Sequence, residues 1–362
     1  MRQTGPRRTT GWSSGTTPGS RSPRERHPHR QRRLDGTAVT GRRVVVLGAT
    51  GFVGRHITKA CATAGHEVLE VSRSPSRTPH GRTAPLDLAT ATTAELAGFL
   101  AAHRPDVVLN AAGTVWQADE PRMRELNDAF VHRLVTALAQ HAAPVRLVHL
   151  GTVHEYGPTP AGLTLTEDRP PAPRGVYGRT KLQGTRWVLA AARDGLDAVA
   201  LRVANACGPG APPQSLLGKV AGELARPAGQ PGGPRELRLA PLTARRDFVD
   251  VRDVADAVMA AAFAPRDAVR GRVINVGRGH AVAVRSLVRR LIELGGPAVR
   301  LVEDEPPDGT RAVAEWQQTD ITTARRLLAW CPTRTLDASL RDLLESVQPQ
   351  RADVAPAGLL PS

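Results

Sequence analysis

Short apolar runs alternate with longer amphipathic stretches through most of this chain. Strands are expected at 43–47, 67–71, 105–110 and 145–151, and the first of the helices between them should end near Ala64. Runs that are apolar on both faces are typical of buried parallel strands. The alternation therefore predicts an α/β fold, a Rossmann-type doubly wound parallel sheet with helical crossovers.

The alternation is interrupted by a Pro- and Gly-rich stretch at 208–234. A strand near 247–251, a helix near 253–263 and a strand at 272–276 are expected to resume it, and Asp253 is expected to cap that helix. Residues 283–347 are predicted to be mainly helical, with a short strand near 298–302.

The positive charge of the chain is concentrated at its N-terminus. The 362 residues carry a formal net charge of +15, and eleven of the arginines lie in residues 1–43 against only Glu25 and Asp35. Residues 1–41 lack apolar periodicity and are predicted to form a disordered basic tail; a second tail is expected at 349–362. Because the excess charge is not on a folded face, we expect no nucleic-acid binding beyond weak contacts of the tail.

Other functional classes are disfavoured by residue usage. No apolar run reaches the roughly 18 residues of a membrane span, so a cytoplasmic protein is expected. Cys61, Cys207 and Cys331 are far apart and lack the spacing of metal ligands, so we expect no metal site. The chain contains only three lysines and two tyrosines, which indicates that those present are required for chemistry.

A glycine-rich turn follows the first predicted strand and opens a helix. Gly48 permits the turn, Gly51 lets the backbone approach a pyrophosphate, and Gly54 lets the helix pack closely on the sheet. The N–H groups of the helix N-terminus favour an anion. This setting predicts a dinucleotide site formed by Gly48, Thr50, Gly51, Phe52, Val53 and Gly54.

The end of the second strand selects the cofactor in such folds. An acid there would bind the ribose hydroxyls of NAD, but this chain has Ser72 followed by Arg73. Arginine pairs with a 2′-phosphate, so NADP is favoured, with NAD possible. Asp87, followed by Leu88, is placed to meet the adenine, or else is a simple turn residue.

Tyr177 and Lys181 lie four residues apart and would share one face of a helix. We expect the lysine cation to lower the pKa of the tyrosine and to hold the ribose of the nicotinamide. Thr152 follows a buried strand, and its hydroxyl could bind the substrate oxygen that Tyr177 protonates. These residues predict an oxidoreductase that moves a proton through Tyr177.

These motifs together resemble the extended short-chain dehydrogenase/reductase family of nucleotide-sugar epimerases, dehydratases and reductases, over about 43–348. The matching stretches are Gly48–Gly54, 110–113, 152–157, Tyr177–Lys181, 201–210, 246–254, 275–277 and 327–332. The resemblance implies a Rossmann domain (42–205 plus 247–277), a smaller C-terminal α/β substrate-binding domain (206–246 plus 278–348), and a homodimer formed through helices near 125–141 and 178–194.

The resemblance also implies the roles of individual residues. Thr152, Tyr177 and Lys181 would be catalytic, and Asn127 would support the lysine and a water relay. The cofactor would be lined by Ala111, Ala112 and Gly113. Asn205 and Arg246 would hold the diphosphate of a nucleotide sugar, with Arg311 as a further candidate.

One departure from the family pattern narrows the reaction. Dehydratases carry Asp-Glu directly after the threonine, where this chain has Val153 and His154. Residues 154–157 instead resemble the Glu-Glu-Tyr-Gly of sugar 4-ketoreductases, so His154 either contacts the sugar or is a loop histidine. The resemblance thus implies reduction of a nucleotide-linked 4-keto-6-deoxy sugar for deoxysugar, natural-product or polysaccharide biosynthesis. The alternatives are an epimerase that retains NAD and a non-catalytic dinucleotide-binding regulator.

Overall fold

The computed structural model describes residues 41–73, 80–115, 118–226, 235–296, 299–304 and 315–348. The predicted basic tail, apart from Gly41, the tail at 349–362 and Arg311 lie outside the described residues. Among the residues that are described, no helix is both long and apolar enough to cross a membrane.

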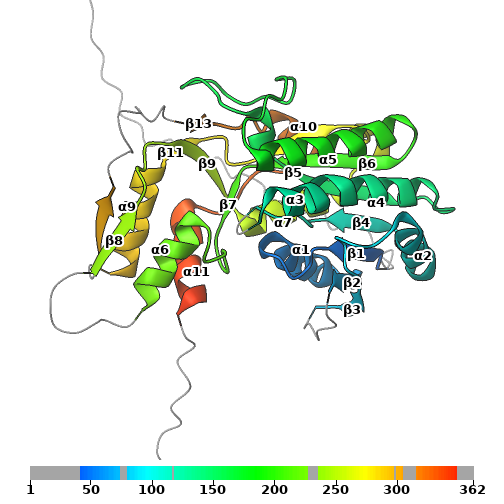
Figure 1. Ribbon diagram of the computed structural model, residues 1–362, viewed down its shortest axis with the longest axis horizontal. Coiled ribbons are helices and arrows are strands. Elements are labelled where there is room, and N and C mark those ends of the chain that lie inside the picture. The colour runs from blue at the N-terminus through cyan, green and yellow to red at the C-terminus, as the bar shows by residue number, and fades with distance from the viewer. Residues whose placement is uncertain are drawn as a thin grey trace, which may run out of the picture. The chain divides into compact units, whose positions relative to one another are not determined.

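One parallel sheet of seven strands organises the first core (Figure 1). Its order is β10-β6-β5-β4-β1-β2-β3, and every neighbouring pair is parallel. The strands are β1 Arg43–Leu47, β2 Glu67–Ser72, β3 Arg82–Pro85, β4 Val107–Asn110, β5 Arg146–Thr152, β6 Asp197–Val203 and β10 Val273–Val276. The order reverses between β1 and β4, the position at which ligands bind in doubly wound sheets. The predicted Rossmann-type fold is confirmed.

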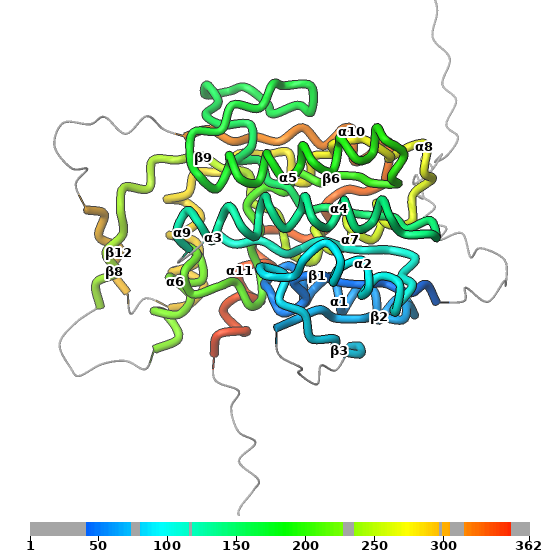
Figure 2. Tube along the Cα trace, turned by 45° about the vertical axis from the view of Figure 1, so that its right-hand side comes forward, coloured from blue at the N-terminus to red at the C-terminus, as the bar shows by residue number. Residues whose placement is uncertain are grey.

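Helices cover both faces of this sheet, as the apolar faces of the crossovers require (Figures 1 and 2). One face packs against α1 Phe52–Thr63, α7 Val251–Phe263, α8 Arg266–Val269 and α10 Thr322–Leu328. The other face carries α2 Thr93–His103, α3 Glu120–Arg124, a π-helical turn Glu125–Ala129, α4 Phe130–Ala139 and α5 Val176–Arg193. The 3₁₀ turn Val153–Tyr156 follows β5 directly.

A second group of elements has a core of its own, which includes Val220, Leu291 and Leu343. Its strands are β7 Asn205–Cys207, β8 Arg235–Leu239, β9 Arg245–Asp250, β11 Ala281–Ala283, β12 Val299–Glu303 and β13 Trp316–Gln317. Its helices are α6 Leu216–Ala225, α9 Val284–Gly295 and α11 Leu336–Val347. How the two predicted domains divide the chain stays a prediction.

The alternation suggested that the strand near 247–251 would rejoin the parallel sheet, but the structure shows that it does not. It is β9, which pairs with β7, β11 and β13 in a separate sheet. The apolar pattern of β9 is that of any buried strand, and a strand's own residues do not specify which sheet it joins.

The start of α7 corrects the expectation for Asp253. The N-cap is Asp250, whose Oδ1 accepts from the N–H of Arg252 at 2.8 Å. Asp253 lies in the first turn, is 1% exposed, and accepts hydrogen bonds from both backbone and side chain of Thr333 and Arg334. Ser339 of α11 donates to Asp250 at 2.6 Å. Both acids therefore tie α7 to the C-terminal part of the chain.

Candidate active site

The glycine-rich turn between β1 and α1 has the close packing that the sequence predicts. Gly48 has φ +78, and a Cβ added to it would lie 2.7 Å from the Ala112 nitrogen. A Cβ on Gly54 would lie 2.0 Å from the Gly48 carbonyl oxygen. No described side chain caps α1 at Gly51. Backbone N–H groups at this N-terminus are therefore available to an anion such as a dinucleotide phosphate.

The cofactor-selecting position lies at the same sheet edge. Val71 is the register partner of Leu47, so Ser72 ends β2 beside the start of the glycine turn. Arg73 follows it and is exposed. Asp87 uses Oδ1 to accept from the Ala89 N–H at 3.0 Å in a turn, and Leu88 is buried. The turn accounts for one carboxylate oxygen of Asp87, and its contact with adenine stays a prediction.

The segment after β4 approaches the helix that carries the catalytic pair. Asn110 Oδ1 accepts from the Ala112 N–H at 3.1 Å, which fixes the path of Ala111 and Ala112. A Cβ on the exposed Gly113 would lie 2.9 Å from Asn127 Oδ1 and 3.6 Å from Lys181 Nζ. Only a glycine keeps this space free, so the residues fit a bound nicotinamide nucleotide.

Asn127 lies in the π-helical turn, a local widening of the helix that often marks functional sites. Its Oδ1 accepts from the Thr114 N–H at 3.0 Å. Its Nδ2 donates to the Thr114 carbonyl at 3.0 Å and to Thr180 Oγ1 at 3.2 Å. Asn127 thus joins the loop after β4 to α5 next to Lys181, near the position the resemblance implied.

Tyr177 and Lys181 lie on α5, and Thr152 ends β5 beside them. Lys181 is buried, and its Nζ donates to the Leu150 carbonyl at 2.5 Å. Burial lowers the pKa of Lys181 to about 8, and the negative charge of Glu155 opposes this. Burial raises the pKa of Tyr177 to about 12, while its hydrogen bond with Thr152 acts in the other direction.

The expectation that the lysine lowers the pKa of Tyr177 is wrong for this structure. The protein around the hydroxyl removes water from the phenolate, and this effect dominates. The Nζ of Lys181 is directed to a backbone carbonyl instead. Tyr177 therefore holds its proton at neutral pH and is suited to donate it.

His154, in the 3₁₀ turn after β5, contacts Tyr177 and connects it to side chains of β7 and β13. The His154 ring lies 5.9 Å from the Tyr177 ring, edge to face. His154 Nδ1 is 3.5 Å from Gln317 Nε2, and Asn205 Nδ2 donates to Gln317 Oε1 at 3.1 Å. Burial lowers the pKa of His154, opposed by the negative charge of Glu315, and Asn205 also hydrogen-bonds its ring. The structure brings His154 and Asn205 together beside the catalytic pair.

Arg246 is held at this place by an acid that the sequence analysis missed. Its guanidinium forms an ion pair with Glu315, and Glu315 Oε1 accepts from Gln317 Nε2 at 2.7 Å. The Nε of Arg246 is buried and has no partner among the described residues. Glu315 and Gln317 carry no motif of their own, and only the pairing of β13 with β9 places them here.

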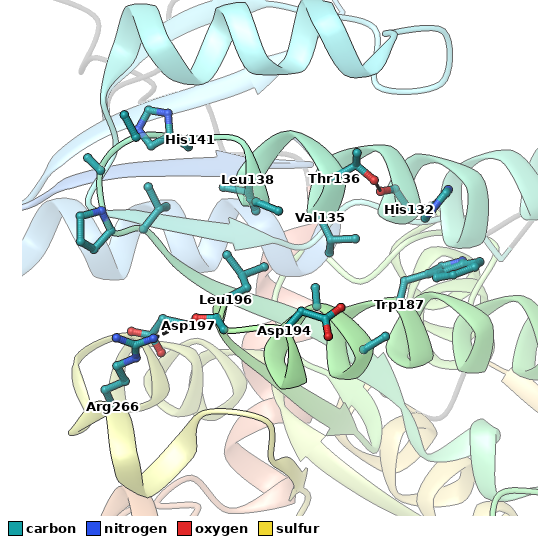
Figure 3. A pocket seen from close by; sticks show the side chains of 18 residues that line it. His132, Val135, Thr136, Leu138, His141, Trp187, Asp194, Leu196, Asp197 and Arg266 are labelled. Atoms are coloured by element: carbon teal, nitrogen blue, oxygen red, sulfur yellow. Dashed lines mark hydrogen bonds between the residues drawn. The ribbon is translucent and has the colours of Figure 1, made fainter.

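A separate hollow of about 720 Å³ lies between α4 and α5, away from these residues (Figure 3). Val135 and Leu138 of α4 and Trp187 of α5 contribute to its lining, together with Asp194, Asp197 and Arg266. None of the predicted cofactor-binding or catalytic residues lines it. It is therefore a feature distinct from the candidate active site.

Comparison with known proteins gives consistent matches. The model of the NAD dependent epimerase/dehydratase family matches residues 44–277. A dTDP-6-deoxy-L-talose 4-dehydrogenase (NAD(P)(+)) from Kitasatospora kifunensis is 45% identical over 305 residues, covering 83% of this chain and 94% of that protein. Among solved structures, RMD from Pseudomonas aeruginosa complexed with NADPH has a TM-score of 0.71 and 25% identity, covering 85% of this chain and 98% of that one. MoeE5 in complex with UDP-glucuronic acid and NAD has a TM-score of 0.68 and 28% identity, covering 83% and 97%.

Proposed function

Because the chain belongs to the NAD-dependent epimerase/dehydratase family, we propose that it reduces the C4 ketone of a nucleotide-linked 4-keto-6-deoxyhexose with NADPH. The chain is an NAD(P)-dependent oxidoreductase of the nucleotide-sugar-modifying type. The family predicted from the sequence motifs is confirmed.

The observation that carries the proposal is the protonated Tyr177 beside Thr152. Enclosure keeps the pKa of Tyr177 at about 12, so its hydroxyl can donate a proton to an oxygen that gains charge. Thr152 would hold the same oxygen. The nicotinamide group, when bound, supplies the hydride. Lys181 would hold its ribose beside Gly113, Asn127 would support Lys181, and the N-terminus of α1 would hold the phosphates.

The sugar nucleotide would lie against the second sheet. Arg246 would bind the diphosphate, since its planar guanidinium matches two phosphate oxygens. His154 and Gln317 lie between Arg246 and Tyr177, where they would contact the sugar. The 45% identical relative is named for a 4-dehydrogenase of a dTDP-linked 6-deoxy sugar, which supports this substrate class.

That relative's name gives the oxidative direction, but oxidation and reduction at C4 share one transition state. The same groups serve both, and cofactor and substrate concentrations set the direction. Arg73 at the NADP-selecting position favours NADPH as the cofactor of the proposed reduction.

The test uses the full chain with NADPH or NADH and 4-keto-6-deoxyhexoses linked to dTDP, GDP or UDP. Loss of reduced-nicotinamide absorbance is expected, fastest with NADPH and a dTDP-linked sugar. The reverse reaction, of a dTDP-6-deoxyhexose with NADP⁺, should restore the absorbance. Conversion of one sugar isomer into another without net oxidation of cofactor would instead identify an epimerase.

We further propose that the chain is a homodimer through the α4 and α5 faces. The hollow between these helices has an apolar lining that includes Val135, Leu138 and Trp187, and such a surface is suited to bury helices of a second copy (Figure 3). Light scattering on the eluting protein should give twice the chain mass, and Ala190→Arg should give monomers. A monomeric wild-type protein at micromolar concentration would contradict this.

A further inference from the structure

A buried acid lies directly behind the candidate catalytic residues. Glu155 follows Thr152 by three residues in the 3₁₀ turn and is fully buried. Its Oε1 accepts from the Thr152 N–H at 2.9 Å and from Thr185 Oγ1 at 3.0 Å. Its Oε2 accepts from Arg202 Nε at 2.8 Å. The carboxylate therefore joins the end of β5 to α5 and β6.

The charges in this network are enclosed by protein. The Arg202 side chain is 4% exposed, and its guanidinium lies over the Tyr156 ring at 4.4 Å from the centroid. Tyr156 in turn donates to Asn275 Oδ1 at 2.7 Å. A buried arginine needs a partner of opposite charge, and Glu155 is its ion-pair partner among the described residues.

The sequence also provides the space that this carboxylate occupies. A Cβ on Gly151 would lie 2.5 Å from Glu155 Oε1 and 3.1 Å from Thr185 Oγ1. Any side chain at position 151 would displace the carboxylate from the Thr152 N–H. Gly151 and Glu155 therefore act as a pair, although the resemblance assigned neither a role.

We propose that Glu155 is a positioning residue that holds Thr152 beside Tyr177 and places a negative charge at the end of β5, where Lys181 donates to the Leu150 carbonyl. Its hydrogen bond to the Thr152 backbone fixes the start of the 3₁₀ turn, from which the Thr152 hydroxyl faces Tyr177. This inference rests on the proposed function for the roles of Thr152 and Tyr177, but its effect on Lys181 can be measured without any sugar.

Two ionisable groups interact electrostatically with Lys181, namely Glu155 on the 3₁₀ turn and His149 on β5. Tyr177 lies one turn away on the same helix, and Arg202 on β6 is bound to Glu155. Burial and the Lys181 charge lower the pKa of His149 well below its usual range, so His149 is neutral and supplies no negative charge. Tyr177 is protonated at neutral pH. Glu155 is thus the anion that opposes the effect of burial on Lys181.

The sign of the effect follows from these groups. Burial lowers the pKa of Lys181 to about 8, and Glu155 keeps it from falling further. Without the carboxylate, Lys181 loses its proton at a lower pH. Binding steps that need the cation then fail at a lower pH as well.

The experiment measures NADPH affinity by protein fluorescence between about pH 6 and 9.5. In the wild type, affinity should fall as the pH rises through about 8. In Glu155→Gln the midpoint should move down by about one pH unit, which at a fixed pH above it weakens binding about tenfold. Gly151→Ala, which keeps every charge but displaces the carboxylate, should move the midpoint in the same direction.

Thr185→Val is the matched control, because it removes a neutral hydrogen bond to the same carboxylate. It should lower thermal stability and leave the pH midpoint unchanged. Equal midpoints in the wild type, Glu155→Gln and Gly151→Ala would overturn the inference, and if Glu155→Gln does not fold, Gly151→Ala decides alone. A wild type that binds NADPH but reduces no sugar would reject the proposed function and leave this test intact.

Discussion

The cofactor side and the sugar side of the candidate site are built in different ways. On the cofactor side, Gly48, Gly54 and Gly113 bring backbone close to backbone or leave a surface free of side chains. On the sugar side, Arg246 and Glu315 form an ion pair between segments that are 69 residues apart in the sequence. Backbone segments packed this closely have little room to move, whereas an ion pair can exchange partners when a diphosphate binds.

The cofactor side would therefore set the affinity for the cofactor, and the sugar side would select the substrate. A rigid backbone suits a ligand that does not vary, and partly exposed side chains suit one that does. Substitutions on the cofactor side should therefore damage folding and cofactor binding together. Those on the sugar side should change substrate affinity and leave the fold intact.

The largest effect is expected where the two sides meet, at Tyr177. Tyr177→Phe removes the donated proton and should lower kcat by about 10²- to 10⁴-fold. NADPH affinity, measured by fluorescence, should stay the same because the ring remains. Full turnover by the variant would remove Tyr177 from the mechanism.

On the cofactor side, Gly54→Ala places a methyl group against the Gly48 carbonyl, 2.0 Å away. Such overpacking costs about 1–3 kcal/mol, so the melting temperature should drop and NADPH binding should weaken with it. Gly98→Ala in α2 is the control, since nothing lies within 4 Å of its added Cβ. That change should raise stability by about 0.5–1 kcal/mol. Unaltered NADPH binding in a folded Gly54→Ala protein would contradict the expected link between close backbone packing and cofactor binding.

On the sugar side, Arg246→Gln should raise KM for the nucleotide sugar about 10- to 100-fold, as expected for a charged hydrogen bond of about 1.5–3 kcal/mol. The melting temperature should change little, because both partners of the Glu315 pair are about one-third exposed. The neighbouring exposed Arg245, as Arg245→Gln, should leave KM unchanged. A stability loss in Arg246→Gln as large as that of Gly54→Ala would show that the two sides do not differ.

The smallest effect is expected at Arg73, an exposed charge on the cofactor side. Arg73→Ala should weaken NADPH binding about fivefold, since exposed charge pairs contribute up to about 1 kcal/mol. NADH binding should not change. Equal losses for both cofactors would mean that Arg73 does not contact the 2′-phosphate.

Sequence patterns predicted the features that depend on neighbouring residues. The glycine turn, the Tyr177–Lys181 pair and five strands of the parallel sheet follow from local spacing, whereas β3 and β6 were not predicted. The sheet to which β9 belongs could not be predicted, because pairing with β7 and β13 is decided by distant partners. Glu315 and Gln317 were missed for the same reason.

The pKa of Tyr177 shows a different kind of limit. The spacing correctly placed a lysine on the same helix face, but the shift depends on how much water the whole fold removes. Lys181 likewise has a backbone carbonyl as its partner, which no side-chain pattern reveals. The closeness of Lys181 to Tyr177 was predictable from the sequence, whereas the removal of water from around Tyr177 was not.

The two acids at the start of α7 bear on how the chain is made. During translation, Asp253 leaves the ribosome 80 residues before Thr333, the first residue of the C-terminal segment that donates to its carboxylate. Ser339, the partner of Asp250, follows later still. Since a buried carboxylate without donors is costly, α7 reaches its final packing only after residues 333–339 have been synthesised. A nascent chain stalled before residue 333 should therefore remain open to proteases and chaperones, however complete its nucleotide-binding half.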